Sequence, residues 1–247
     1  MASPARGRLA RGSLDRDRIL EAALTLAEDV GLANLNVPML AARLDVGVTS
    51  IYWHISNRDE LIRLMTARAV DRLDGLLPRP DGREPADWPS YLREYFTRQR
   101  DIFAHDDLLT DLTVMRAMKY APKTLGMGYQ GIELVLRYLI TAGFAPVDAW
   151  NLYSALSLYT QGFAVVERRS RVNGFPRDPA QQAEAVDVEK TPIIAELVRA
   201  GAVSLDLAGD PTFEAGLQWL LDGAAARASA REKAIPGANH ARTGRSG

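Results

Sequence analysis

Apolar residues recur along most of the chain with the spacing of α-helices, and no segment shows a convincing strand pattern. In the first periodic segment one face of a helix is formed by Ile19, Ala23, Leu26, Ala27 and Val30. Gly31 follows directly and is placed to end that helix. The pattern predicts an all-α protein.

Three more helices are predicted in the N-terminal part of the chain. Asn36 can cap a short helix that runs to about residue 44. After a short turn, a third helix covers residues 48–54. Ser56, with Asp59 three residues later, predicts the cap of a fourth helix, whose apolar stripe reaches residue 76.

A loop rich in proline and glycine, residues 78–85, separates this part from a longer helical part. There the predicted helices cover residues 88–104, 107–119, 123–142, 147–169, 192–201 and 211–229. The two ends of the chain lack periodicity, which is typical of disordered segments. We therefore predict a basic arm (1–13), an N-terminal helical domain (14–76), a larger helical domain (86–229) and a tail (230–247).

Charge is concentrated at the two ends of the chain. The net charge is −1 overall, but it is +3 over residues 1–18 and +4 over residues 227–247, so that −8 remains for the middle. Basic ends on an acidic body favour a polyanionic partner. Basic tails that merely aid solubility explain the same pattern.

Composition argues against several classes of protein. The 247 residues include no cysteine and only three histidines, so a disulfide framework and a cysteine-ligated metal site are excluded and a His-rich metal site nearly so. No glycine-rich phosphate loop or paired acid and base stands out. The most apolar stretch, residues 134–145, is too short to span a bilayer and contains Arg137. We expect a cytoplasmic protein that needs no metal or cofactor, does not associate with membranes and is not an enzyme.

The second and third predicted helices have the spacing of a helix-turn-helix, over about residues 36–55, with Gly47 in the turn. In such a pair the second helix places the side chains at its start in the major groove of DNA. Short helix pairs also occur in proteins that bind no DNA, so the spacing alone leaves both possibilities open.

The sequence of residues 50–61, SIYWHISNRDEL, resembles the recognition-helix region of the TetR family of transcriptional regulators. Residues 19–31 and 40–44 are similar to the first and second helices of that family. The Tyr-Trp-His triplet and the later segment LSLYTQGF (156–163) look closest to the tetracycline repressors. The resemblance implies a homodimer that binds a palindromic operator and releases it when a small molecule binds.

The DNA contacts are expected around the start of the third helix. Val48, Thr49 and Ser50 lie where base edges come within reach, and Trp53 can touch a thymine methyl group. The family pattern gives phosphate contacts to Tyr52, His54 and Arg58. The complete predicted DNA-binding set is Asn36, Val48, Thr49, Ser50, Tyr52, Trp53, His54 and Arg58. The alternatives are a core role for Tyr52, a structural role for His54 and a solvated Arg58.

Two departures from the tetracycline repressors change the expected specificity. Pro38 stands where those repressors carry an arginine that reads a guanine, so the operator sequence differs. Residues 116–118, Arg-Ala-Met, stand where they carry a metal-binding histidine. We therefore expect an effector other than tetracycline and release that needs no magnesium. Glu167 matches a family glutamate near the metal, but it could equally pair with Arg171.

The larger domain is rich in methionine and aromatic residues, which suit an apolar or aromatic effector with a few polar handles. The predicted effector pocket consists of Phe96, Phe103, Met115, Met118, Tyr120, Met127, Tyr159, Phe163 and Glu167. The alternative is that these residues are plain core. We expect the fourth helix, as the sole link between the domains, to carry the effector signal to the DNA-binding part.

Small residues on the helices near 147–169 and 211–229 predict the dimer interface, because they permit close approach of helices. They are Ala149, Ser154, Ala155, Ser157 and Gly162 on the first helix, and Ala215, Gly216, Gly223, Ala224 and Ala228 on the second, where they lie beside Phe213, Trp219 and Leu220. Packing within one subunit is the alternative. For the whole chain a ligand-responsive repressor is the favoured function, ahead of a helical protein-interaction module with a degenerate helix-turn-helix and, last, an enzyme.

Overall fold

The computed structural model of the chain describes residues 14–115, 129–176 and 178–234, with the side chains of the last four left out. Over these residues the structure contains helices and connecting turns and no strand, so the predicted all-α class is confirmed. The chain forms two compact units. Of the described residues, the N-terminal unit contains 14–75, 106–115 and 129, and the C-terminal unit contains 76–105, 130–176 and 178–234.

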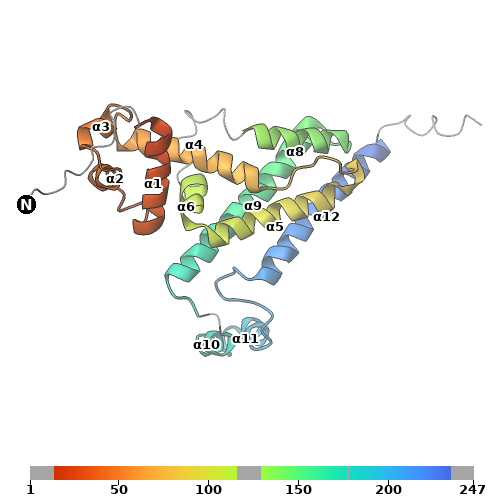
Figure 1. The fold of residues 1–247 in the computed structure, drawn as a ribbon. Helices are drawn as coiled ribbons and strands as arrows, with labels where there is room; N and C mark the ends of the chain where they lie inside the picture. Colours follow the sequence, from red (N-terminus) through yellow and green to blue (C-terminus); the bar gives the residue numbers. More distant parts are fainter. Residues whose placement is uncertain (1–13, 116–128, 177, 235–247) are drawn as a thin grey trace, which may run out of the picture. The chain divides into compact units, whose positions relative to one another are not determined.

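The N-terminal unit is a small helical bundle (Figure 1). Its helices are α1 (Arg16–Val30), α2 (Val37–Arg43), α3 (Val48–Tyr52), most of α4 (Arg58–Leu76) and α6 (Asp107–Thr110), which runs into one π-helical turn (Asp111–Met115). Ile19, Leu40, Ile51 and Met65 are completely or almost completely buried in its core. The first four helices therefore form where the sequence pattern predicts them.

Local capping explains most of the boundaries in this unit. The Asn36 side chain accepts a hydrogen bond from the Met39 amide at 3.0 Å, as predicted for a cap of α2. Gly31 ends α1 with a positive φ of 79°. The predicted cap of α4 is one residue out of register. The Asn57 side chain, and not that of Ser56, accepts a hydrogen bond from the amide three residues later, which is the Glu60 amide. The Ser56 amide in turn donates to the Glu60 carboxylate.

The core of the N-terminal unit includes two residues from far along the chain. Leu108 and Leu112 are buried in the same cluster as Ile19 and Leu40. An ion pair of 3.3 Å joins Arg72 to Asp106 next to them. The segment that begins at residue 106 therefore groups with the N-terminal helices, whereas the sequence pattern placed it within the larger domain.

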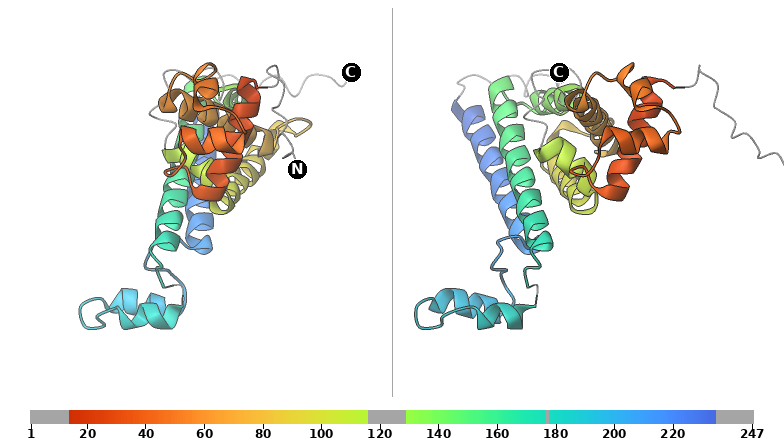
Figure 2. Two further views of the ribbon diagram at one scale, coloured as in Figure 1. Left: turned by 60° about the vertical axis from the view of Figure 1, so that its left-hand side comes forward. Right: turned by 90° about the vertical axis from the view of Figure 1, so that its left-hand side faces the viewer.

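The C-terminal unit is built around long helices. They are α5 (Trp88–His105), preceded by a short 3₁₀ turn (Pro85–Asp87), then α8 (Tyr129–Thr141), α9 (Pro146–Val172), α10 (Pro179–Glu184), α11 (Pro192–Arg199) and α12 (Asp210–Ala234). Helices α9 and α12 run side by side, and α5 packs against both (Figure 2). The short helices α10 and α11 pack on each other beyond one end of this pair.

The sequence pattern missed α10, although its start carries a recognisable signal. Asp178 accepts a hydrogen bond from the Ala180 amide, and Pro179 occupies the first turn. The same cap-and-proline combination correctly marked the starts near Pro192 and Pro211. The ends of the predicted helices 107–119 and 123–142 that fall in 116–128 lie outside the described residues. Among the described helices, none is both long and apolar enough to cross a membrane.

Candidate DNA-binding and effector sites

The turn between α2 and α3 sets the direction of the candidate recognition helix. Asp45 adopts the left-handed conformation, with φ of 54°, which a short polar side chain tolerates. Gly47 is extended, with φ of −72°, so it is the N-cap of α3 and not the residue that makes the turn possible. The Val46 amide donates to the Ala41 carbonyl at 3.0 Å and closes the turn. The two helices therefore form the predicted helix-turn-helix.

Helix α3 is anchored through one side and exposes the other. Ile51 and, just beyond the helix, Ile55 are 1% and 2% exposed and lie in the core. Trp53 is 84% exposed and Tyr52 47% exposed. Val48 and Thr49 are exposed as well, and Ser50 and His54 are half-buried. A core role for Tyr52, the alternative open at the level of sequence, does not fit its exposure.

The backbone at the end of α3 is held by charged side chains. Arg16 of α1 donates to the His54 carbonyl oxygen at 3.0 Å and pairs with the Glu60 carboxylate at 2.9 Å. Hydrogen bonds from the amide and the side chain of Ser56, aided by the charges of Arg16 and Arg63, hold the pKa of Glu60 below its ordinary value. Helix α3 is thus pinned to both α1 and α4.

Two predicted DNA-contacting residues have partners inside the unit. The Arg58 guanidinium donates to the carbonyl oxygens of Leu32, Ala33 and Leu35 at 3.2, 3.4 and 3.3 Å. The expected phosphate contact by Arg58 finds no support in this arrangement, because Arg58 ties the α1–α2 loop to the start of α4. Asn36 is occupied as the cap of α2, so a contact with DNA would have to compete with that bond.

The predicted effector residues fall into four groups. On α5, Phe96 and Phe103 are buried. On α9, Tyr159 and Phe163 contact Phe213 of α12, with ring centroids 5.5 and 5.2 Å apart. Met115 is 57% exposed and belongs to the N-terminal unit, whereas these four residues belong to the C-terminal unit. Three further predicted residues, Met118, Tyr120 and Met127, lie outside the described residues.

Tyr159 is committed to the contact between α9 and α12. Its hydroxyl donates to the carbonyl oxygens of Thr212 and Phe213 at 3.0 and 3.1 Å. This close approach requires Gly216, because a Cβ there would lie 2.2 Å from the Tyr159 hydroxyl oxygen. Gly216 and the buried Phe213 and Ala149 therefore serve packing within one subunit, which was the alternative to a role in the dimer.

Glu167, the ninth predicted effector residue, pairs with an arginine that the sequence analysis did not single out. The Nε atom of Arg100 donates to the two carboxylate oxygens of Glu167 at 3.1 and 3.2 Å, and Nη2 also bonds Asp210 at 2.6 Å. Arg100 lies 4.6 Å from the ring centre of Phe213. Burial opposes the charge on Arg100, but the hydrogen bonds to the two carboxylates outweigh it, so the pKa of Arg100 is raised. Arg171, the alternative partner that the spacing offers, donates to the Ala104 carbonyl oxygen at 2.8 Å.

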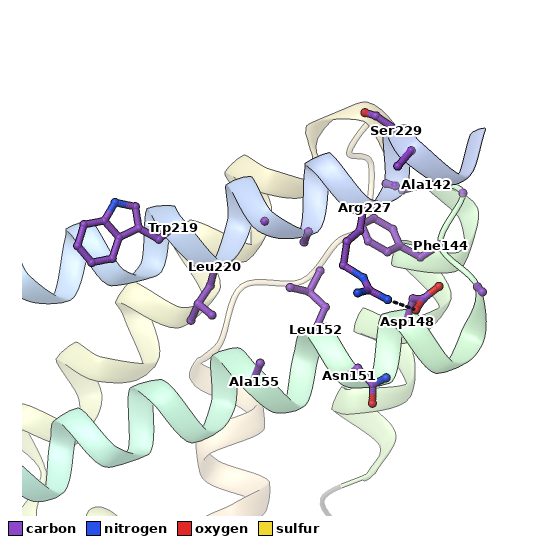
Figure 3. A pocket seen from close by; sticks show the side chains of 16 residues that line it. Ala142, Phe144, Asp148, Asn151, Leu152, Ala155, Trp219, Leu220, Arg227 and Ser229 are labelled. Carbon is purple, nitrogen blue, oxygen red and sulfur yellow. Dashed lines mark ion pairs between the residues drawn. The ribbon is translucent and has the colours of Figure 1, made fainter. Parts of the chain in front are cut away.

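A cleft of about 1260 Å³ opens between the start of α9 and the second half of α12 (Figure 3). Small residues such as Ala155 and Gly223 line it, with Leu152 and Trp219 among the larger ones. Arg227 reaches Asp148 across it at 4.0 Å. None of the six predicted effector residues that the structure describes lines this cleft. Within the described part of the chain, no group of three or more acidic or histidine side chains is arranged to hold a metal ion.

Two protein-family models together match most of the chain. Residues 19–65 match the model of bacterial regulatory proteins of the tetR family, and residues 83–228 match the tetracyclin repressor-like C-terminal domain. The chain belongs to the TetR family. The family resemblance drawn from the SIYWHISNRDEL segment is thereby confirmed, as is the expected division into a helix-turn-helix part and a larger helical part.

Individual relatives show the same relation. The chain is 35% identical to the HTH-type transcriptional repressor Rv1353c of Mycobacterium tuberculosis, over 88% of this chain and 82% of that protein. It is 31% identical to the class A tetracycline repressor of transposon 1721 from Escherichia coli, over 87% and 92% of the two chains. The expectation of a DNA-binding transcriptional repressor agrees with these relatives.

Solved structures extend the comparison to the fold. Apo ActR of Streptomyces coelicolor, a TetR family protein, matches with a TM-score of 0.69 and 26% identity, over 90% of this chain and all of that one. ActR in complex with actinorhodin matches with a TM-score of 0.66 and 27% identity, over 87% and 98% of the two chains. Members of this family therefore include proteins whose C-terminal helices resemble those of this TetR-family chain and that bind a small molecule.

Proposed function

We propose that this TetR-family chain is a homodimeric repressor that binds a palindromic operator through α3 and leaves it when an apolar or aromatic effector binds the C-terminal unit. One observation carries the DNA-binding part. Tyr52 and Trp53, two large aromatic side chains, are exposed on a helix that Ile51 and Ile55 hold firmly in the core. An aromatic pair exposed in this way needs a partner surface, and the major groove admits one helix. The proposal assigns the chain no enzymatic activity.

The proposed contacts divide by chemistry. Val48, Thr49 and Ser50 read base edges with methyl and hydroxyl groups, and Trp53 contacts a thymine methyl group. Tyr52 and His54 bond phosphates, which position the helix without reading sequence. Asn36 and Arg58 act indirectly, by fixing the start of α2 and the loop before it.

The proposed dimer forms through α9 and α12. Gly216 and its neighbours pack within the subunit, but several large apolar side chains stay exposed on these two helices. Leu158 and Val172 of α9 are 71% and 73% exposed, and Trp219 of α12 is 74% exposed. Exposed Gly162 and Gly223 lie on the same helices and allow close approach. A second copy that packs here would also cover the cleft beside Trp219.

The proposed effector differs from a tetracycline–metal chelate. Support comes from Glu167, whose carboxylate is already neutralised by Arg100. ActR, whose complex with actinorhodin this chain resembles in fold, shows that a TetR family member of this shape takes an organic ligand. We propose that operator release by this chain needs no magnesium.

The chain passes between the two units three times, after residues 75, 105 and 129, and the first two of these links form the proposed signal path. Helix α4 continues from the N-terminal unit to the boundary at residue 75, as expected. The segment after His105 is a second link, because Leu108 and Leu112 belong to the N-terminal core while α5, directly before it, belongs to the C-terminal unit. The expectation that the fourth helix is the sole link between the domains is therefore corrected.

The test of the proposal is DNA binding to the region upstream of the protein's own gene, measured over a range of salt concentrations. Each neutralised phosphate contributes about −0.9 to the slope of log K against log salt. We expect a steep slope for the wild type. Trp53→Ala and Thr49→Ala should each weaken specific binding by about 1–3 kcal/mol and leave non-specific binding nearly unchanged. A slope near zero for the wild type would refute the DNA-binding function.

A further inference from the structure

Two buried polar atoms between α5 and α9 have no hydrogen-bond partner in the part of the chain that the structure describes. They are Oε1 of Gln99, a residue 4% exposed, and Oγ1 of Thr160, a residue 0% exposed. Buried polar atoms are almost always paired, and an unpaired one is costly to the fold. Their persistence therefore requires an explanation.

Threonines elsewhere in the chain provide an internal control for Thr160. A helical threonine commonly donates its hydroxyl to the carbonyl four residues earlier. Five hydroxyls do so at 2.7–3.0 Å, those of Thr25, Thr66, Thr110, Thr113 and Thr141. The Thr160 hydroxyl does not form this local bond, although the residue lies within the long helix α9. Its hydroxyl is thus left available to a partner outside its own helix.

Gln99 and Thr160 lie on the two helix faces that meet. Phe96, one turn before Gln99, contacts Tyr153 of α9, with ring centroids 5.8 Å apart. Arg100, next to Gln99, bonds Glu167. Thr160 is seven residues from both Tyr153 and Glu167, so it shares their face of α9. A third unpaired hydroxyl, that of Thr97, lies off this stripe of α5.

The surroundings define the chemistry that these two atoms can receive. Phe96, Tyr153 and Leu156 are buried and apolar or aromatic. The charge of Arg100 is compensated by Glu167 and Asp210, so the seam offers no free charge to an ionic ligand. The Gln99 oxygen only accepts, whereas a threonine hydroxyl can donate. A hydroxyl group is the ligand function that suits both atoms, because it can donate to Gln99 and accept from Thr160.

We infer that the effector of this protein is a neutral aromatic molecule with a hydroxyl group, which is held between α5 and α9 by Gln99 and Thr160. This inference rests on the proposed function, because it names the ligand class of the proposed effector domain. It makes the two unpaired atoms recognition groups that discriminate between a hydroxyl and its ether.

The experiment compares 2-naphthol with 2-methoxynaphthalene by isothermal titration calorimetry on the full chain. The ether oxygen accepts a hydrogen bond but cannot donate one to Gln99. We expect about tenfold tighter binding of 2-naphthol to the wild type, which corresponds to one good hydrogen bond. Gln99→Leu should reduce this ratio to about one, and Thr160→Val should weaken binding of 2-naphthol about five- to tenfold.

Thr66→Val is the matched control, because Thr66 is equally buried but its hydroxyl bonds the Ile62 carbonyl at 2.9 Å. It should leave ligand binding unchanged. In thermal unfolding without ligand, Gln99→Leu and Thr160→Val should raise Tm by about 2–4 °C, since each removes an unpaired buried atom, and Thr66→Val should not. These stability shifts show that the variants fold.

Absence of 2-naphthol binding, equal binding of both probes to the wild type, or an unchanged ratio in Gln99→Leu would overturn the inference. Operator binding of the same variants is measured in parallel without ligand. If the wild type failed to bind DNA, the proposed function would fall. The ratio of the two naphthalene affinities would still decide the inference, because calorimetry reads it without DNA.

Discussion

Helix α3 and helix α5 present their chemistry in opposite ways. Around α3, the polar and aromatic side chains of Thr49, Tyr52 and Trp53 are exposed, and Ile51 alone anchors the helix itself. Along α5, the polar Gln99 and the charged Arg100 are buried together with Phe96. Under the proposed function the difference reflects the size of the partner, because a DNA duplex needs an open surface and a small molecule needs enclosure.

The two regions also differ in how much their side chains affect the stability of the fold. An exposed aromatic on α3 adds little to the stability of the fold, so it can be exchanged as the operator changes. A buried charge on α5 is retained only when partners from other helices compensate it. Substitutions in the first region should therefore change binding, and those in the second should change stability as well.

The largest effect is expected at Arg100. Arg100→Met leaves the partly buried Glu167 without its cation and should lower the free energy of unfolding by about 3 kcal/mol. Arg93→Met is the control, because Arg93 contacts Glu214 of α12 at 3.7 Å near the surface, where an ion pair contributes less than about 1 kcal/mol. Urea unfolding measures both. Equal losses in the two variants would show that the Arg100 cluster behaves as a surface pair.

Ile51 and Trp53, two residues apart in the α3 region, test the same contrast between a buried and an exposed side chain. Ile51→Ala should lower the free energy of unfolding by about 2–4 kcal/mol, because it empties a filled core site. Trp53→Ala should change it by less than about 0.5 kcal/mol. Urea unfolding followed by circular dichroism distinguishes the two. A stability loss of more than about 1 kcal/mol for Trp53→Ala would place Trp53 in the core.

A substitution at Arg58 distinguishes an internal structural role of this side chain from a role in DNA binding. Arg58→Ala removes three hydrogen bonds to loop carbonyls and should cost about 1–2 kcal/mol of stability, while the salt slope of DNA binding stays the same. Arg43→Ala, which breaks an exposed pair with Asp29, is the control and should cost less than about 1 kcal/mol. A slope reduced by about one at unchanged stability would restore the phosphate contact.

The smallest effect concerns the start of α4 and depends on pH. The lowered pKa of Glu60 means that its carboxylate stabilises the folded state above the ordinary value of 4.5 and loses this contribution as the pH falls through the lowered value. Glu60→Gln should therefore cost about 0.5–1 kcal/mol at pH 7 and nothing at strongly acidic pH. Thermal unfolding at several pH values measures the difference. A loss that grows on acidification would contradict the assigned cause.

Local signals made most of the fold predictable. Helix periods, the Asn36 cap and the glycine at position 31 depend on neighbours within a few residues, and these predictions hold. The cap of α4 was misplaced by one residue because Ser56 and Asn57 are both good caps. Only the position of the Glu60 carboxylate, on the Ser56 amide, decides between them.

The proposed effector site was less predictable because it depends on contacts between distant segments. Glu167 could be matched to Arg171 by spacing alone, yet its partner Arg100 comes from another helix, 67 residues earlier. Gln99 gave no signal in the sequence, since a glutamine in an amphipathic helix usually faces water. Met115 was assigned by residue type, but its segment groups with the N-terminal helices.

The burial of Leu108 and Leu112 among the N-terminal helices has a consequence for protein engineering. A DNA-binding module cut at the end of α4 would leave an uncovered apolar patch where these two leucines lie. A chimera that joins residues 14–76 to a foreign sensor would inherit that defect unless the sensor supplies equivalent side chains. A graft that carries residues 106–115 along with the first four helices would keep the module's interior intact, so the transferable unit is discontinuous in sequence.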